Sequence, residues 1–386
     1  MAYSKDVAVL DVGSEKLTVF IGERTVNGTF NVKSTGEAPY EGFKGGQWLD
    51  PDGLFDAVEK ACAGATRSLG GRFRKLYVGV PGEFTTVVTK EVGFALEKTR
   101  KIRDCDLDEL FKTGDTFGDN SRFITINCSA IYYVLDGNRR LIEPRGLVSS
   151  KLRALVSYVL AERSFTQCFD DILKRLGFSE VEYISACWAE SMLLFEAEQR
   201  DKSALLLDVG FISSSLMLVR GDGLLHLSSF SCGGGNIAAD LNMCLDIPYT
   251  QAKMIRQKLN LSILPTEDDK YSLLTRGGEV SYSMLEVNEV ARGRIEYIAQ
   301  AVQKCIEKCE YECPAYLPLY VTGGGLANIR GTREILSSVL GRPVEFISPA
   351  VPQMSSPHLS TTLGILDVAL KSEKKTTFLQ RIFGKF

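Results

Sequence analysis

The amino-acid sequence predicts an α/β protein in which one structural unit occurs twice. The chain opens with a strand at residues 7–11, a tight turn and a strand at residues 17–22, and the same order returns from residues 204–208 onward. Elsewhere, short apolar runs alternate with segments of helical spacing, such as residues 52–66. Alternating strands and helices are typical of sheets covered by helices, so the sequence indicates two related α/β halves.

Composition places the chain among globular proteins with a balanced surface. Of its 386 residues, 45% are hydrophobic and 24% are charged, which is enough for one or two full cores. The formal net charge of −3 gives no general basic field, so no nucleic-acid partner is expected. The first apolar run is too short for a signal peptide, and no run reaches the ~18 residues of a membrane-spanning helix. We therefore expect no export, and any membrane contact should be peripheral.

The stretch from about residue 84 to residue 161 differs in character from its surroundings. Strand-like segments there flank a charged helix near residues 106–113, which indicates a small α+β insertion. Its strands are expected at residues 85–90, 122–126, 130–135 and 151–160. Further on, the spacing predicts helices at 165–176, 188–198, 240–259 and 286–311, with an irregular stretch at 261–278.

Ten cysteines are scattered along the chain without the paired spacing of a zinc or redox site. Cys305, Cys309 and Cys313 lie four residues apart and would share one helix face. Core packing is favoured over a metal role, because no fourth ligand is evident.

Each of the two hairpins ends its first strand in an aspartate, Asp11 or Asp208, and continues into a turn with glycine and hydroxyl residues. Such a turn lets backbone N–H groups approach phosphate oxygens, and the aspartate can hold Mg²⁺ through its waters. Taken alone, either turn could be an ordinary hairpin turn. The pair favours a clamp around the phosphates of a nucleotide.

Two glycine runs strengthen this interpretation. Residues 233–235 precede Asn236 and a predicted helix, and residues 323–325 follow a predicted strand. Glycines at such places let the backbone approach a ligand without an intervening side chain, although plain loops are the alternative.

The C-terminal residues have the pattern of a helix that lies on a membrane surface. Five large apolar side chains fall on one continuous helix face, and two basic residues lie on its flank. The preceding residues 371–377 are polar and basic, as expected of a linker near an anionic membrane. Docking of the helix on the protein's own core is the alternative. The residues concerned are Phe378, Leu379, Arg381, Ile382, Phe383, Lys385 and Phe386.

Taken together, the two aspartate hairpins and the glycine turns resemble the phosphate and adenosine motifs of the actin/Hsp70 superfamily over the whole chain. Residues 11–16 and 19–23 are similar to the opening hairpin of the bacterial FtsA family of cell-division proteins, including Lys16. The insertion occurs where that family carries its SHS2-type subdomain, residues 293–298 are similar to a family helix segment, and the C-terminus resembles the family's membrane-targeting helix. The resemblance implies an actin-like ATPase fold of two duplicated RNase H-like subdomains with an FtsA-type α+β insertion.

This resemblance also implies a division of the chain. Domain I would comprise residues 1–83 and 162–203 around the insertion at 84–161, and domain II residues 204–240 and 315–370 around a small subdomain at 241–314. A basic linker at 371–377 and the amphipathic helix at 378–386 would complete the chain.

The resemblance implies ATP and Mg²⁺ as cofactors, with Asp11 and Asp208 as the metal-binding residues. Glu190 is the acidic candidate for orienting a water molecule, although an exposed helix surface is the alternative explanation for it. The expected nucleotide-binding residues are Asp11, Gly13, Ser14, Lys16, Asp208, Gly210, Ser213, Gly233, Gly234, Gly235, Asn236, Gly323, Gly324 and Gly325.

The implied partners are the C-terminal tail of FtsZ, further copies of the chain in a head-to-tail filament, an anionic membrane surface and other division proteins. Arg292 and Arg294 in the small subdomain could pair with acidic residues of the FtsZ tail, although a solvated, internally paired helix is the alternative. The implied location is the cytoplasmic face of the cell membrane.

One departure from the family pattern concerns the second phosphate turn, where Phe211 and Ile212 replace glycines. Their side chains should crowd a nucleotide unless the loop changes course, so ATP turnover is expected to be slow at most. Alternative functions on the same fold are a PilM-like pilus-assembly scaffold and a kinase or other ATPase of the superfamily.

Overall fold

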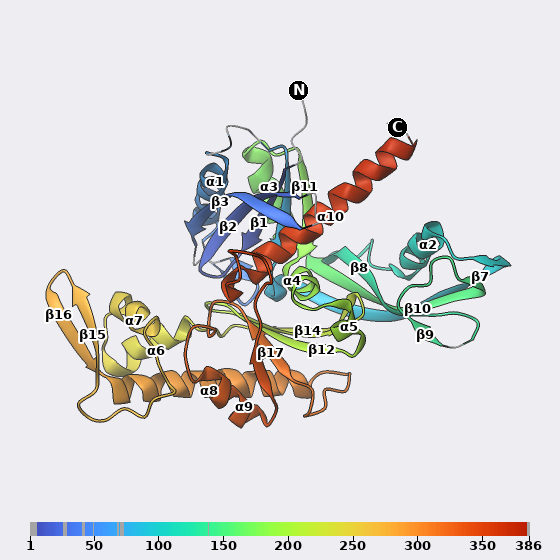
Figure 1. Ribbon diagram of the computed structural model, residues 1–386. Coiled ribbons are helices and arrows are strands. Elements are labelled where there is room, and N and C mark those ends of the chain that lie inside the picture. Colours follow the sequence, from blue (N-terminus) through green and yellow to red (C-terminus); the bar gives the residue numbers. More distant parts are fainter. Residues whose placement is uncertain are drawn as a thin grey trace. The chain divides into compact units, whose positions relative to one another are not determined.

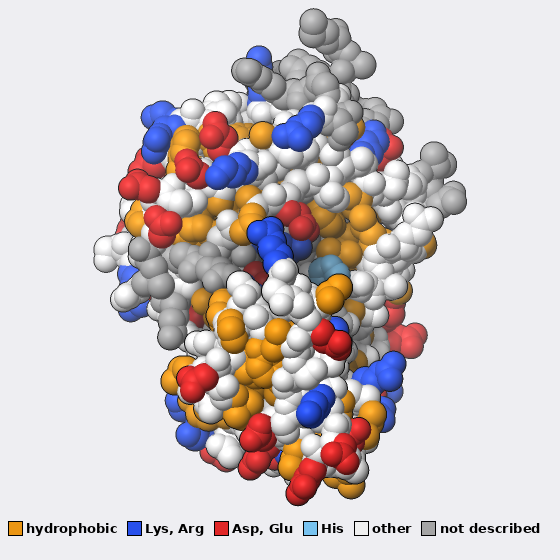
Figure 2. Space-filling view, turned by 90° about the vertical axis from the view of Figure 1, so that its left-hand side faces the viewer, with side chains coloured by type: hydrophobic (Ala, Val, Ile, Leu, Met, Phe, Trp, Pro, Cys, Tyr) orange, Lys and Arg blue, Asp and Glu red, His pale blue; other side chains and the backbone are white. Residues whose placement is uncertain are grey.

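The computed structural model describes residues 6–25, 29–40, 43–48, 50–67, 69, 73–137 and 139–383. The chain divides into two compact units (Figure 1). Unit 1 comprises Met1–Ala204, Met217–Leu227 and Thr361–Phe386, and unit 2 comprises Leu205–Leu216 and Ser228–Ser360. Figure 2 shows that basic and acidic side chains are interspersed on the visible face, as a net charge near zero suggests.

Unit 1 is built on a five-stranded sheet of order β11-β6-β1-β2-β3. Strand β1 pairs antiparallel with β2 in the expected hairpin and parallel with β6 on its other side. The strands are β1 Val7–Val12, β2 Lys16–Arg24, β3 Phe30–Pro39, β6 Lys75–Val80 and β11 Glu180–Ser185, with small strands β4 Phe43–Lys44 and β5 Gln47–Trp48.

Helices of unit 1 bury their apolar sides in a shared core. Helix α1 (Pro51–Thr66) begins where the Asp50 side chain accepts a hydrogen bond from the Gly53 N–H. Nearby, the rings of Trp48 and Phe84 stack with centroids 5.0 Å apart. Outside the insertion, the other described helices before residue 204 are α3 Arg163–Arg175, α4 Ala186–Leu194 and α5 Ala197–Asp201, with the 3-10 turn η1 Gly82–Phe84.

The insertion is an α+β element, as the sequence predicted. Its sheet has the order β7-β10-β8-β9, from β7 Thr85–Lys101, β8 Phe123–Val134, β9 Arg140–Leu141 and β10 Val148–Glu162, with helix α2 Asp104–Gly114. Strands β7 and β10 are longer than expected, and the two strands expected at 122–126 and 130–135 are one strand, β8. The pairing of β10 with β8 shifts register twice, between Leu155 and Val156 and between Val159 and Leu160, so β8 continues through the residues between the two expected strands.

The long helix α10 (Ser360–Phe383) groups with unit 1 from Thr361 onward, whereas residues up to 370 were expected in domain II; the same holds for residues 217–227. Glycines on both sides allow α10 to pack closely. A Cβ at Gly79 of strand β6 would lie 2.2 Å from Ile365 Cδ1, and a Cβ at Gly364 of α10 would lie 2.7 Å from the Ala189 backbone. Helix α10 also runs through residues 371–377, the expected linker. This segment is rich in lysine, with glutamate and no glycine or proline, so nothing in it ends a helix.

Unit 2 contains most of the second hairpin and the two glycine runs. The sheet order is β14-β13-β12-β17-β18, from β12 Ala204–Val209, β13 Ser214–Arg220, β14 Gly223–Phe230, β17 Leu319–Thr322 and β18 Val344–Phe346. Its helices are α6 Asn236–Leu245, α7 Tyr249–Arg256, α8 Met284–Glu307 and α9 Thr332–Leu340, with the hairpin β15 Lys270–Thr275 and β16 Gly278–Ser283 and the turn η2 Pro357–Leu359.

Three sequence-based expectations for unit 2 are wrong. The helix expected at 240–259 is two helices, because Asp246 is left-handed (φ 51°) and Pro248 follows. The irregular stretch at 261–278 contains strand β15 and the start of β16. Helix α8 ends at Glu307, so Cys309 and Cys313 lie beyond it and do not share a helix face with Cys305.

Candidate functional site

The first candidate turn lies in unit 1, at the end of strand β1. Gly13 donates its backbone N–H to the Lys16 carbonyl (3.1 Å), which closes the turn after Asp11. The Asp11 carboxylate accepts a hydrogen bond from the Thr362 hydroxyl (2.6 Å), in the first turn of helix α10. The turn and a helix more than 300 residues away in the sequence therefore meet at one carboxylate.

Burial raises the pKa of Asp11 to about 6, against the lowering effects of the Thr362 hydrogen bond and of Lys16. A buried carboxylate whose charged form is disfavoured would gain from a nearby cation. No group of three or more His, Cys, Asp or Glu side chains in the described part of the chain forms a metal cage. This arrangement suits Mg²⁺, which usually keeps several of its waters and binds one or two carboxylates.

Glu190 lies in helix α4 and is buried, with 1% of its surface exposed. The interpretation of this residue as part of an exposed helix surface is therefore wrong. Its carboxylate accepts a hydrogen bond from the Thr361 hydroxyl (3.1 Å). Because Gly364 lets α10 approach the backbone of Ala189 and Glu190, the first turn of α10 contacts both Glu190 and Asp11.

Lys16 and Ser14 complete the description of the first turn. Lys16 forms an ion pair with Glu37 (2.6 Å) in the neighbouring strand β3, so its ammonium group already has a partner. Ser14 is buried, with 7% of its surface exposed.

The second candidate turn lies in unit 2, where strands β12 and β17 run parallel and pair Asp208 with Thr322. Gly323 follows directly with φ 87°, and a Cβ there would lie 2.1 Å from Asp208 Oδ1. Gly325 donates its N–H to the Val209 carbonyl (2.7 Å). The glycine run at 323–325 therefore packs directly on the aspartate turn.

The other glycine run bonds to the same turn. Gly234 donates its N–H to the Gly210 carbonyl (3.0 Å), and Gly235 donates to the Phe211 carbonyl (2.6 Å). The Gly210 N–H in turn donates to the Ser213 carbonyl (2.9 Å), and Asn236 Oδ1 accepts from the Gly233 N–H (2.8 Å). Turn 208–213 and both glycine runs thus form one backbone cluster in unit 2, which also includes Gly324 between its two neighbours.

Phe211 is accommodated inside this cluster. Its side chain is buried with 7% of its surface exposed, and a Cβ at Gly235 would lie 2.6 Å from its ring. Lys253 Nζ lies 4.8 Å and Arg256 Cζ 5.7 Å from the ring centroid, within cation–π range. Glycine is therefore favoured at position 235, because the Phe211 ring occupies the space that a Cβ would need.

Of the two candidate partner-binding arginines on helix α8, only Arg292 is exposed. Arg294 is half-buried and makes a two-pronged ion pair with Asp240 of helix α6, with both N–O distances 2.5 Å. A bidentate pair of this kind stabilises the packing of α8 on α6. The i,i+4 pairing considered for this helix is not what holds Arg294.

The C-terminal candidates lie partly within helix α10 and partly outside the described residues. The backbone at Phe378, Leu379, Arg381, Ile382 and Phe383 is helical, and Lys385 and Phe386 lie outside the described residues. Upstream, Glu373 accepts hydrogen bonds from Lys75 Nζ and Tyr77 Oη, both 2.7 Å, which attach α10 to strand β6. Among the described helices, none is long and apolar enough to cross a membrane.

Sequence reasoning missed Thr361 and Thr362, which bring Glu190 and Asp11 to one helix end. The available signal was the run of hydroxyl residues at 360–362, shortly after Pro357. It also missed Lys253 and Arg256, for which a basic helix offers no signal without the fold.

Comparison with known proteins identifies relatives over most of the chain. The family of "Cell division protein FtsA" matches residues 205–364. The FtsA proteins of Bacillus subtilis and Pseudomonas aeruginosa are 20% and 21% identical to this chain. The alignments cover 95% of this chain and 83% of the B. subtilis protein, and 96% of this chain and 90% of the P. aeruginosa protein.

Solved structures share the fold. The PilM–PilN type IV pilus biogenesis complex matches with a TM-score of 0.61 at 15% identity, over 94% of this chain and 98% of the matched chain. MreB5 of Spiroplasma citri bound to AMPPNP matches with a TM-score of 0.56 at 10% identity, over 97% of this chain and 99% of the other. The fold is that of the actin-like ATPases, and the chain is similar to the FtsA cell-division proteins over most of its length, the resemblance that its sequence predicted.

Proposed function

We propose that this protein is an ATP-binding adaptor of the division machinery that polymerises and tethers FtsZ filaments to the cytoplasmic face of the membrane. The observation that carries the proposal is the repeated aspartate turn: Asp11 and Asp208 each end a central strand in front of a glycine, in a chain related to FtsA. Glycine turns in front of helices are common phosphate-binding devices.

In this proposal, Asp11 and Asp208 hold Mg²⁺ through its waters, and bound Mg²⁺ neutralises phosphate charge. The raised pKa of Asp11 supports this role, because a cation offsets the cost of its buried charge. The N–H groups of Gly234 and Gly235 already bond to turn carbonyls, so the cluster of unit 2 supplies shape and a rigid aspartate more than free donors. Glu190, held by Thr361, is the candidate for orienting a water molecule.

The membrane contact is assigned to the apolar face of residues 378–386. A helix of nine residues is too short to be stable alone in water, so its attachment to α10 provides a helical start that lipid can extend. The gross gain of burying five large apolar side chains, about 1.5–3 kcal/mol each, is offset by ordering costs, so one tail should bind weakly. Polymerisation would link many tails and convert weak binding into firm attachment.

Vesicle sedimentation tests the anchor with a matched pair of charges. Phe383→Glu introduces a carboxylate on the apolar face, whereas Thr377→Glu adds the same charge opposite the centre of that face, at 3.6 residues per turn. We expect Phe383→Glu to lose binding to anionic vesicles and Thr377→Glu to remain bound. Equal sedimentation of both variants would remove the membrane-anchoring role from the tail.

The acidic tail of FtsZ is proposed to dock on the subdomain at residues 241–314, with exposed Arg292 as a contact. Because Arg294 already pairs with Asp240, its loss would disturb the packing of α8 instead. Arg292→Glu should weaken co-sedimentation with FtsZ and leave the unfolding midpoint unchanged. Unchanged co-sedimentation would remove this residue from the proposed contact.

A further inference from the structure

The insertion and its surroundings in unit 1 form a hollow that is separate from both aspartate turns. Its volume is about 480 Å³, within the range of small-molecule sites. Five of its nine lining residues are apolar or aromatic, and four are charged. The part formed by Ile131 and Tyr132 of strand β8 is called its floor. The lining residues are Ile131, Tyr132, Arg139, Arg140, Leu141, Ile142, Leu147, Asp201 and Arg220.

The charges of this hollow are not balanced by ion pairs. In the described part of the chain, Arg139, Arg140 and Arg220 have no carboxylate partner, and Arg140 only lies over the Tyr132 ring at 4.4 Å. Other arginines of the insertion are paired, such as Arg100 with Asp106 and Arg122 with Glu162. Three arginines against Asp201 give a net charge of +2 in one hollow (3 − 1 = 2).

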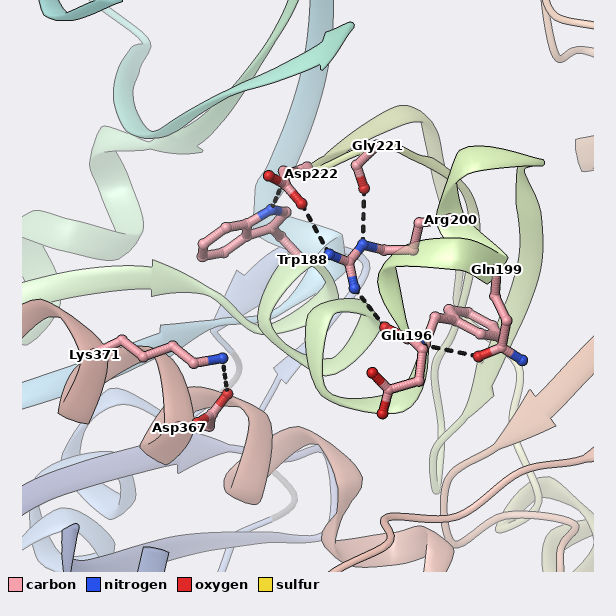
Figure 3. Close-up of polar contacts among 9 residues, drawn as sticks. Trp188, Glu196, Gln199, Arg200, Gly221, Asp222, Asp367 and Lys371 are labelled. Carbon is pink, nitrogen blue, oxygen red and sulfur yellow. Dashed lines mark hydrogen bonds and ion pairs between the residues drawn. The ribbon is translucent and has the colours of Figure 1, made fainter. Parts of the chain in front are cut away.

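Asp201 and Arg220 lie at the end of helix α5 and beside the β13–β14 turn, which together are called the wall of the hollow. Figure 3 shows hydrogen bonds at the neighbouring residues Arg200, Gly221 and Asp222. Arg200 donates to the carbonyls of Gly221 (2.8 Å) and Phe195 (2.5 Å) and to the Asp222 carboxylate (2.8 Å). Trp188 Nε1 donates to the Asp222 carbonyl (2.9 Å). The end of helix α5 and the β13–β14 turn are thus joined at the residues next to Asp201 and Arg220.

The same turn is fixed to the floor of the hollow. Gly221 has φ 56°, and a Cβ there would lie 2.1 Å from the Ile131 carbonyl oxygen, so only glycine allows this approach. The Asp222 N–H donates to the Ala130 carbonyl (3.2 Å) of strand β8. Wall and floor therefore keep a fixed geometry, which lowers the ordering cost of binding a ligand.

We propose that this hollow binds a small organic phosphate. Guanidinium groups match the geometry of phosphate oxygens. A phosphate monoester carries close to two negative charges, which would balance the net charge of +2 in the hollow. The apolar floor would contact the carbon body of the ligand, and Asp201 would accept a hydrogen bond from a ligand hydroxyl or amine.

The test uses 1-naphthyl phosphate as the probe, whose fluorescence and saturation-transfer NMR signals report binding. We expect saturable binding to the full chain, about tenfold weaker in Arg220→Gln because one charged hydrogen-bond donor is lost. Arg122→Gln, which removes a paired arginine outside the hollow, should bind like the parent. Circular dichroism on each variant shows whether the fold is retained.

Three results would overturn the proposal: no saturable binding, equal affinity in Arg220→Gln and the parent, or equal affinity for 1-naphthol. Loss of probe binding in Asp208→Asn would assign the probe to the nucleotide turn and also overturn it. Displacement by soluble glycerol 3-phosphate would identify a free metabolite as the ligand, and displacement by vesicles with phosphatidic acid a lipid headgroup.

Discussion

The two aspartate turns have the same topology but use their surroundings differently. In unit 1, Asp11 is held by a threonine hydroxyl, and burial raises its pKa to about 6. In unit 2, Asp208 lies against Gly323, and the nearby glycine N–H groups bond to the turn itself, with Phe211 inside the cluster. The two hairpins therefore differ: the first turn contains an electrostatically costly carboxylate, and the second is a tightly packed scaffold.

The largest expected effect concerns the packing of the second turn. Gly323→Ala combines a positive φ with a Cβ 2.1 Å from Asp208 Oδ1, so we expect a loss of about 3–4 kcal/mol in the free energy of unfolding of unit 2. Gly341→Ala is the matched control, because φ is 61° there and nothing lies within 4 Å of the added Cβ. That control should cost about 1 kcal/mol. Denaturant unfolding measures both, and equal losses would contradict a packed second turn.

A similar loss should follow from removal of the phenylalanine. Phe211→Ala deletes a buried ring that contacts Gly235 and lies below Lys253 and Arg256, at an expected cost of about 3 kcal/mol. The urea midpoint of unit 2 would report it. An unchanged urea midpoint would mean that the ring does not support the glycine run.

A substitution in the first turn should raise the free energy of unfolding, in contrast to the two substitutions in the second turn. The folded-state pKa of Asp11 is raised, so the folded protein binds a proton that the unfolded chain does not bind between about pH 4 and pH 6. The ionised side chain therefore lowers stability at pH 7. This cost begins to shrink as the pH falls through the folded pKa and is gone below the unfolded-state pKa of about 4. Asp11→Asn should raise the free energy of unfolding at pH 7 by on the order of 2 kcal/mol, and by almost nothing near pH 4.

The control is Glu59→Gln, which removes an exposed carboxylate of helix α1 and should change stability little. Thermal unfolding in metal-free buffer at the two pH values checks both variants. A gain that does not depend on pH would show that Asp11 is not the titrating group.

The sequence predicted the elements that depend on local pattern. Both aspartate hairpins, the α+β insertion and the glycine runs follow from short apolar strands and turn residues, and they appear in the structure where expected. Contacts between distant segments could not be predicted from such patterns. Nothing local to Thr362 indicates that it bonds to Asp11, and nothing local to Gly79 indicates that Ile365 fills the space above it.

The surroundings of Phe211 also depend on contacts between distant segments. Phe211 and Ile212 replace glycines, and this predicted crowding of a nucleotide unless the loop changes course; in the structure the Phe211 ring lies next to Gly235. The way the fold resolves that crowding depends on helix α7, whose Lys253 and Arg256 cover the ring. Helix α7 itself was expected as part of a longer helix, so this contact lay beyond sequence reasoning.

The claim that both turns serve one nucleotide is tested most directly by calorimetry of ATP binding to the full chain, with and without Mg²⁺. The account predicts Mg²⁺-dependent binding that weakens in both Asp11→Asn and Asp208→Asn, because each variant removes one proposed metal-binding carboxylate. Absence of Mg²⁺-dependent binding, or equal affinity of the parent and both variants, would contradict it.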